Sequence, residues 1–311
     1  MEIKRFNAEH KSLWDSFIDD SRNGTFLLKR DYMEYHSDRF HDHSLLFFDG
    51  GKLLALLPAN AVDDTFYSHQ GLTYGSFVLG IKTTSAIVLD IFACLLSYLR
   101  EKGFKQLIYK PIPHIYHKQP AEEDLYALFR NEAKLLYRNL ACCINIAAPI
   151  KYSRIRKRAI VRANESGLNV VETSEAGAFW TILEENLGER YGTKPVHSLE
   201  EISCLIEKFS SRIRLFQSVD NKGCVLAGAL VFDMEQVVHV QYTSANAEGK
   251  KIGALDIIYD HLLTNIFPDK RFFDFGTSNE EGGRYLNESL IAQKESFGGR
   301  GIAYDGYLIE L

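Results

Sequence analysis

The stretch from Val237 to Gly299 constrains the fold more than any other part of the chain. A strand that carries several polar residues is expected at 237–249, followed by a helix at 253–267 and a second strand at 271–276. This order and spacing predict a βαβ unit, whose crossover is right-handed in almost all proteins. The loop before the helix presents backbone N–H groups at the positive end of the helix dipole, where phosphate binds well. We therefore expect a sheet with a phosphate-bearing ligand at the mouths of its strands.

The length of the chain predicts two domains. Its 311 residues exceed the roughly 100–200 of a typical domain. Both halves are expected to run through helices, an antiparallel hairpin, a long helix and further strands, with the long helices starting about 165 residues apart. The prediction is an α+β protein with mixed sheets, in which domains 1–149 and 150–311 share one architecture.

Composition excludes several classes of protein. The net charge of −5 argues against a general nucleic-acid binder. Five cysteines, with Cys142 and Cys143 adjacent and no CxxC pair, indicate reduced thiols in the cytoplasm and no zinc site. The longest apolar helix, expected at 86–99, is far shorter than the roughly 20 residues that span a bilayer. We expect a cytoplasmic protein without a membrane span and without a metal; the histidines at 36–43 are expected in a polar loop.

Polar side chains on the strand at 237–243 indicate chemistry. Strict alternation would place His239, Gln241 and Thr243 on one face, and Val238, Val240 and Tyr242 on the other. A buried strand between helices is normally apolar on both faces, so a histidine and a glutamine there need partners or a ligand. His239 is a candidate general base, and the alternative is a hydrogen-bonded core histidine.

The neighbouring strand carries an acid among phenylalanines. Asp274 must be paired or functional, because an unpaired buried carboxylate is costly. It is a candidate base, orienting group or anchor for a substrate amine. The alternatives are a helix N-cap or an ion pair with Lys294 or Arg284. Lys294 lies on a helix expected at 284–295, which is otherwise amphipathic.

Four segments are the most specific in the chain: PVHSLEEI (195–202), VQYTSAN (240–246), FFDFGTSNEEGGRYLNESL (272–290) and QKESFGGRG (293–301). With these segments and this order of elements, the chain resembles the GNAT acyltransferase fold and looks like a FemAB-like protein with two tandem GNAT domains. The resembling families place a lysine before a Phe-Gly pair, as Lys294 stands before Phe297 and Gly298 here, and the resemblance implies that this lysine stabilises a developing oxyanion or binds a phosphate or carboxylate. GNAT proteins usually carry a glycine-rich phosphate loop, and the corresponding region here is EGKKIGAL (248–255), with Lys250 where the first glycine would stand. A capped turn followed by a solvated helix end is the plainer interpretation of this region.

This resemblance implies an N-acyltransferase in which a bound amine attacks the carbonyl of an acyl carrier directly. The implied carrier is acetyl-CoA or another acyl-CoA, and the acceptor an amino sugar or cell-wall amine. The candidate residues are catalytic His239, Tyr242, Asp274 and Lys294; cofactor-binding Ser244, Gly249, Lys250, Lys251, Gly253 and Ala254; and substrate-binding His69, Tyr74, Tyr191, His197, Gln241 and Asn287. Tyr242 or Tyr285 would protonate the leaving group, whereas Ser198 and Glu201 are explained by a helix capping box.

Two alternatives stay open from the sequence. The carrier could be an aminoacyl-tRNA, as the likeness to peptidoglycan cross-bridge enzymes allows, with the basic run at 151–162 meeting its phosphates. That run is equally well explained as a solvated helix face. The chain could instead be a binding protein of the same fold without catalytic activity, because fold alone does not fix function.

Overall fold

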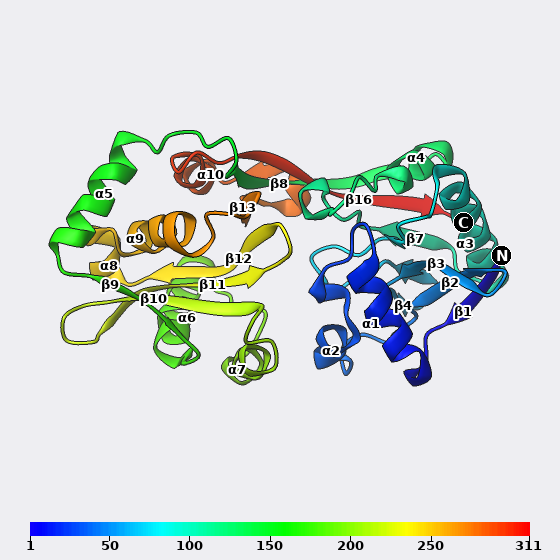
Figure 1. Ribbon diagram of the computed structural model, residues 1–311, viewed down its shortest axis with the longest axis horizontal. Helices are drawn as coiled ribbons and strands as arrows, with labels where there is room; N and C mark the ends of the chain where they lie inside the picture. The colour runs from blue at the N-terminus through cyan, green and yellow to red at the C-terminus, as the bar shows by residue number, and fades with distance from the viewer. The chain divides into compact units, whose positions relative to one another are not determined.

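The computed structural model describes the backbone of residues 1–311 and all side chains except those of Arg190 and Tyr191. Contacts divide the chain into two compact units (Figure 1). The first unit comprises residues 1–140, 279–285 and 303–311, and the second comprises 141–278 and 286–302. The division into domains at residues 149 and 150 stays a prediction, since compactness alone does not show which segments fold independently.

The first unit contains two groups of strands. One sheet has the order β1-β2-β3-β6, and the other strands follow the order β4-β5-β7-β16-β8. The strands are β1 (Glu2–Arg5), β2 (Leu45–Asp49), β3 (Lys52–Leu57), β4 (Asn60–Val62), β5 (Thr65–Tyr67), β6 (Val78–Leu79), β7 (Gln106–Tyr109), the first part of β8 (Lys134–Asn145) and most of β16 (Arg300–Glu310). The helices are α1 (Lys11–Asp20), α2 (Arg30–Met33), α3 (Ser85–Glu101) and α4 (Glu123–Arg130). Helix α3 buries an apolar stripe that includes Phe92 and Leu95 in the core of this unit.

The second unit is built on strands in the order β8-β13-β12-β11-β10-β9. Its elements are α5 (Arg154–Glu165), β9 (Asn169–Thr173), α6 (Gly177–Tyr191), α7 (Leu199–Lys208), β10 (Ile213–Val219), β11 (Val225–Asp233), β12 (Val237–Ala245), α8 (Ala247–Ile252), α9 (Ala254–His261), β13 (Phe272–Thr277) and α10 (Glu288–Glu295). β12 and β13 run parallel, and the pairs β9–β10, β10–β11 and β11–β12 are antiparallel. The capping box of Ser198 and Glu201 at the start of α7 is confirmed.

Helices cover both faces of this sheet (Figure 1). On one face, the ring of Phe179 from α6 occupies the space where a side chain at Gly228 of β11 would lie. On the other face, Tyr259 of α9 packs edge-on against Phe273 and Phe275 of β13. The fully buried apolar run of β11 therefore lies between two helical layers, as expected for a strand buried on both faces.

A β-bulge changes the expected side-chain pattern of β12. Leu230 of β11 pairs with Tyr242 and Val231 pairs with Val240, which leaves Gln241 as the extra residue. The bulge shifts the alternation by one position. Tyr242 and His239 therefore point to the same face, and Thr243 points to the other, where Tyr259 donates a hydrogen bond to its hydroxyl at 2.9 Å. The predicted grouping of His239 with Thr243 is wrong for this reason.

The helix expected at 253–267 is interrupted. Asn246 caps the short helix α8, Gly253 takes a left-handed φ of 87°, and α9 begins at Ala254 and continues into a π-helical turn at Leu262–Ile266. A side chain at Gly253 would meet the carbonyl oxygen of Ala159 in α5 at 2.6 Å. Because the break lets α5 approach this closely, glycine is required there for both conformation and space.

Other boundaries also differ from expectation. Residues 26–36 form a series of short turns, with a 3-10 helix at Phe26–Leu28, α2, and a 3-10 helix at Glu34–His36. Residues 65–79 hold two short strands, β5 and β6, joined by a loop. The helix expected at 284–295 begins at Glu288. In the described part of the chain, no helix is long and apolar enough to cross a membrane.

Candidate functional site

Strands β12 and β13 separate in the second unit. Their parallel ladder covers three positions and ends where His239 pairs with Asp274. The pairing of β13 with β8 shifts register just after Asp274, and Gly276 takes a left-handed φ of 71°. β12 stays paired with β11 as far as Ala245. The two strands thus diverge at Gly276, and the edge of β12 that faces β13 is open beyond this point.

A buried polar network holds this divergence. Asp274 is fully buried, and its carboxylate accepts one hydrogen bond from Nδ1 of His239 at 2.8 Å and one from the backbone N–H of Gly276 at 2.9 Å. The same carboxylate thus orients the imidazole of His239 and fixes the backbone bend at Gly276. With Nδ1–H donated to Asp274, Nε2 is the ring nitrogen that carries the lone pair.

Lys294 joins the same network from α10. Its Nζ donates to the carbonyl oxygens of Gly276 at 3.0 Å and Thr277 at 2.7 Å. Burial lowers the pKa of Lys294 to about 8, although the nearby Asp274 opposes this shift. An ammonium has three donors, so two carbonyl contacts leave one N–H for a further acceptor. The structure brings together three of the four predicted catalytic residues around one bend.

A cavity of about 230 Å³ opens between the diverging strands. Its wall includes Thr243 and Ser244 of β12, Phe275 of β13 and Lys294 of α10. The other lining residues come from the end of β12, from α6, α8, α9 and α10, and from the segment after α10: Ala245, Leu183, Asn186, Leu187, Lys250, Leu255, Tyr259, Leu290, Gln293 and Phe297. The cavity is therefore an apolar slot with a few polar groups, the usual character of a small-molecule site.

The predicted phosphate loop is partly helical. Asn246 occupies the N-terminus of α8 by accepting a hydrogen bond from the N–H of Gly249 at 2.8 Å. Gly249 and Gly253 both lie against backbone carbonyls of neighbouring elements, and Ala254 is fully buried. Lys250 lines the cavity and contacts Asn186. Lys251 is exposed on the same short helix. Cationic side chains, more than an open glycine loop, are thus the groups available to an anion here.

Tyr242 lies on the face of the sheet covered by α6. Its hydroxyl lies 2.6 Å from Nδ1 of His197, and its ring meets Trp180 edge-on. Burial raises the pKa of Tyr242. The residues lining the slot do not include Tyr242, His197 or Gln241, nor do they include His239 or Asp274 at the bend. The bulge places Tyr242 on the same face of β12 as His239.

Two predicted substrate-binding residues belong to the first unit. His69 is buried with a left-handed φ of 61°, and its ring stacks near His36. Burial lowers the pKa of His69 to about 3. Tyr74 is also buried and donates to the hydroxyl of Thr25 at 3.1 Å. Both side chains take part in packing a tight loop, and their role in binding stays a prediction.

The remaining predicted residues are placed as follows. Asn287 caps α10 by accepting a hydrogen bond from the N–H of Leu290 at 3.1 Å. Tyr191 lies outside the described residues. Tyr285 is 55% exposed. Among the residues that the structure describes, no group of three or more histidine, cysteine or acidic side chains could hold a metal ion.

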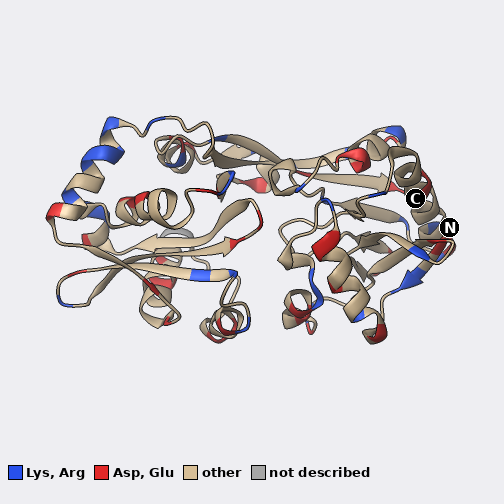
Figure 2. Ribbon diagram, in the orientation of Figure 1, with Lys and Arg blue, Asp and Glu red and all other residues tan. Residues whose placement is uncertain are grey.

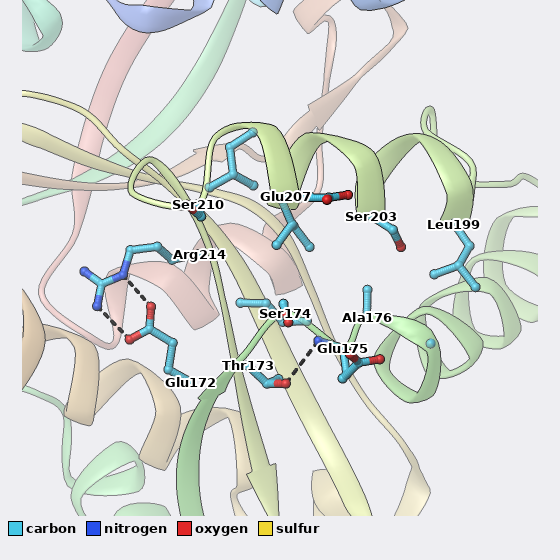
Figure 3. A pocket seen from close by; sticks show the side chains of 14 residues that line it. Glu172, Thr173, Ser174, Glu175, Ala176, Leu199, Ser203, Glu207, Ser210 and Arg214 are labelled. Carbon is cyan, nitrogen blue, oxygen red and sulfur yellow. Dashed lines mark hydrogen bonds and ion pairs between the residues drawn. The ribbon is translucent and has the colours of Figure 1, made fainter.

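A larger cavity of about 770 Å³ lies elsewhere in the second unit, between β9 and α7 (Figure 3). Its principal charged pair is internal, since Arg214 donates to both carboxylate oxygens of Glu172 at 2.7 and 2.8 Å. Thr173 accepts a hydrogen bond from the N–H of Glu175 at 3.0 Å (Figure 3). The one arginine of this cavity is thus paired within the lining, and the lining includes none of the residues at the bend of β13.

Sequence reasoning missed most of the slot lining. Asn186 is the clearest example, because its side chain donates to Ser244 at 2.8 Å and to the carbonyl of Ala245 at 3.0 Å. A signal for it exists in the sequence. Asn186 is flanked on one helix face by Leu183 and Leu187, and a polar residue within an inward-facing stripe calls for a partner.

Comparison with known proteins gives the fold a name. No protein family model and no curated protein matches the sequence. Solved structures do match over nearly the whole chain. FemX superposes with a TM-score of 0.71 at 12% identity, covering 100% of this chain and 98% of that chain. The chain has a FemAB-like tandem GNAT fold.

Two further structures have this FemAB-like tandem GNAT architecture. L-PGS from Bacillus licheniformis matches with a TM-score of 0.62 at 12% identity, over 97% of this chain and 91% of that chain. A tandem GNAT protein from the clavulanic acid biosynthesis pathway matches with a TM-score of 0.51 at 10% identity, over 99% and 98%. At such low identity, the likeness extends to the acyltransferase fold and leaves the acyl donor and acceptor open.

Proposed function

We propose that this chain is an N-acyltransferase that moves an acyl group from an acyl-CoA, such as acetyl-CoA, to an amine. The amine would belong to a small molecule such as an amino sugar or a cell-wall precursor. The slot between β12 and β13 is the observation that supports the proposal. It combines an open strand edge, an apolar wall and a buried cation, Lys294, at one bend.

The slot suits the narrow arm of a thioester carrier. An extended arm with amide groups can complete the hydrogen-bonding edge of β12 that β13 leaves beyond His239, much as an added strand would. At about 230 Å³ the cavity has room for such an arm and not for a whole nucleotide. The phosphates would lie outside it, within reach of Lys250 at the rim.

The bend supplies groups for the transfer step. The amine nitrogen attacks the carbonyl carbon, a C–N bond forms, and the C–S bond breaks as the thiolate leaves. We assign the remaining N–H of Lys294 to the developing oxyanion, where a preorganised donor has its largest effect. His239 does not line the slot itself, but it lies beside Gly276 at the bend and is oriented by Asp274, and we assign it to accept the proton that the amine loses. The leaving thiolate takes its proton from solvent.

Carrier binding tests this proposal directly. Purified protein is titrated with acetyl-CoA, longer acyl-CoAs and free CoA, and thermal stability is measured. Binding at 100 times the dissociation constant should stabilise the chain by about 2.7 kcal/mol. Leu255→Trp places a large ring in the slot and should abolish the shift while the protein stays folded. No shift with any of these carriers would overturn the proposal as stated.

Neighbouring lysines provide a matched control. Lys250 lines the slot and Lys251 does not, although both lie on α8. Lys250→Ala should weaken CoA binding about tenfold, the loss of one charge-assisted contact, whereas Lys251→Ala should leave it nearly unchanged. If both variants weakened CoA binding equally, the lysines would act through their overall charge and not through contacts in a defined site. Transfer from aminoacyl-tRNA without response to CoA would favour the alternative carrier, and no response to either would favour a binding protein.

A further inference from the structure

Helix α5 packs against the rest of the second unit through small residues. Ala159 and Ala163 are buried, and Gly253 at the start of α9 meets the backbone of Ala159. Arg156 points inward and makes an ion pair with Asp256 at 2.7 Å. The inner face of α5 is thus held by close packing and one ion pair. The opposite face of the helix is exposed to solvent.

The outer face of α5 combines cations with aliphatic side chains. Arg154, Arg158 and Arg162 are exposed and recur every four residues, so they form one stripe along the helix. Ile155 and Val161 flank this stripe and are 69% and 55% exposed. Figure 2 shows the basic residues as bands along α5. These two side chains gain significance only if they belong to a larger exposed apolar surface.

The cations on this face are not neutralised by the part of the chain that the structure describes. Arg154, Lys157 and Arg158 make no ion pair with any described residue. The one acid of α5 is Glu165, at its last position. The whole chain carries a net charge of −5, so the positive face is a local feature against an acidic background.

An apolar groove continues this face at the start of α5. Its volume is about 440 Å³, and its lining is mainly apolar, from Ile144, Ile146, Pro149, Ile150, Leu263 and Phe297, with Tyr152, Thr264 and the acid Asp260 beside them. Lys151 and Lys157 also line it and are exposed, and Ile150 is 45% exposed. Aliphatic and cationic groups therefore extend from the groove along the outer side of the helix.

We propose that this surface, formed by α5 and the adjoining groove, docks the protein onto a bilayer that contains anionic lipid. The cations match lipid phosphates, and Ile150, Ile155 and Val161 match the boundary with the acyl chains. RNA would use the cations but gain little from exposed aliphatic residues, and it is normally bound by stacking on exposed aromatic side chains. The aromatic residues of the groove are buried, in the case of Phe297, or half-buried, in the case of Tyr152. The aliphatic residues therefore favour a membrane.

Vesicle sedimentation of the full chain tests this proposal. The probes are phosphatidylcholine vesicles with and without about 30% phosphatidylglycerol, at low salt and at about 0.15 M salt. We expect binding only to the anionic vesicles. Arg154→Glu with Arg158→Glu should reduce the partition coefficient at least tenfold, given about fivefold for each cation at an anionic surface. The bound fraction should fall as salt rises.

A second pair of variants separates lipid from RNA. Ile155→Ser with Val161→Ser keeps every charge and should lower vesicle binding severalfold without changing retention of total tRNA on a filter. Matched controls on α4 of the first unit are Phe129→Ser, at a side chain 79% exposed, and Arg130→Glu, which should both bind vesicles normally. Circular dichroism establishes that each variant is folded. The proposal is overturned if anionic vesicles are not bound, or if the serine pair binds vesicles as the wild type does.

Discussion

Each unit contains a strand, a long helix and a returning strand, yet the space between the two strands is used differently. In the second unit, β12 and β13 pair at their base and then diverge around a slot. In the first unit, β6 and β7 belong to different sheets. The Tyr109 hydroxyl joins them instead, accepting from the N–H of Phe77 at 2.9 Å and donating to Asp124 at 2.9 Å.

The difference shows that the same order of elements can leave either a filled space or an open slot between the two strands. The filled space between β6 and β7 is called the seam of the first unit. Tyr109 and Asp124 are buried and satisfy each other, so the seam of the first unit holds packed side chains. In the second unit, the corresponding polar groups fix backbone atoms of the bend at Gly276 and leave a space beside them. Both units also bury a lysine held by two carbonyl oxygens, Lys110 in the first and Lys294 in the second.

The largest effect is expected from breaking the bend of the slot. Asp274→Ala removes the acceptor of His239 and of the Gly276 N–H, so both donors are left buried. We expect a loss of about 3–5 kcal/mol in unfolding free energy, measured by urea denaturation. Asp274→Asn keeps the shape and an acceptor and should cost less. A loss below about 1 kcal/mol for the alanine variant would show that the network does not hold the bend.

The pH dependence of stability should reveal the buried lysine of the slot. Burial lowers the pKa of Lys294 from its ordinary value of 10.5 to about 8 in the folded protein. Between pH 8 and 10.5 the native state therefore binds fewer protons than the unfolded chain. The unfolding free energy should therefore rise as pH increases from 8 to 10.5, by on the order of 3 kcal/mol. Lys294→Met should remove the part of the pH dependence that this lysine contributes. Burial also lowers the pKa of Lys110 to about 8, so Lys110→Met should remove a similar contribution and serves as the matched control.

Lys110 separates stability from function. If the slot is the reaction site, Lys294→Met should abolish acyl transfer in an identified reaction, whereas Lys110→Met should change the pH slope alone. Equal loss of transfer in both variants would contradict the contrast between a filled seam and a working slot.

The seam of the first unit should give a pH effect of opposite sign. Burial raises the pKa of Asp124 from 3.8 to about 6, so the native state binds more protons than the unfolded chain in this range. The unfolding free energy should fall by about 3 kcal/mol as pH rises from 3.8 to 6. Asp124→Asn should flatten this part of the curve, as followed by denaturation at several pH values. An unchanged curve would mean that Asp124 does not titrate in this window.

The smallest effect is expected on the face of β12 covered by α6. Tyr242→Phe removes the contact of the hydroxyl with His197 and keeps the ring against Trp180. We expect a loss of about 1 kcal/mol in unfolding free energy, and no change in CoA binding, because Tyr242 does not line the slot. Loss of carrier binding in this variant would place the functional groups on both faces of β12.

Local patterns in the sequence predicted much of the second unit. The βαβ order of β12, α9 and β13, the cap at Ser198 and the choice of Asp274 and Lys294 all follow from runs of a few residues. The bulge at Gln241 did not, because it is defined by the register of β12 against β11, and one extra residue reverses the faces of all residues beyond it. Gly253 suggested a phosphate loop, but its left-handed conformation and the approach of Ala159 give it a packing role.

The sequence by itself determined the order of the elements and the presence of polar groups on strands that should be apolar. Both are local properties, since periodicity and the cost of burying a polar group are felt within a few residues. Only the tertiary structure decided that Asn186, Ser244, Tyr259 and Lys294 line one slot. These side chains come from four elements distant in the chain, and packing and strand register, which no local pattern encodes, bring them together.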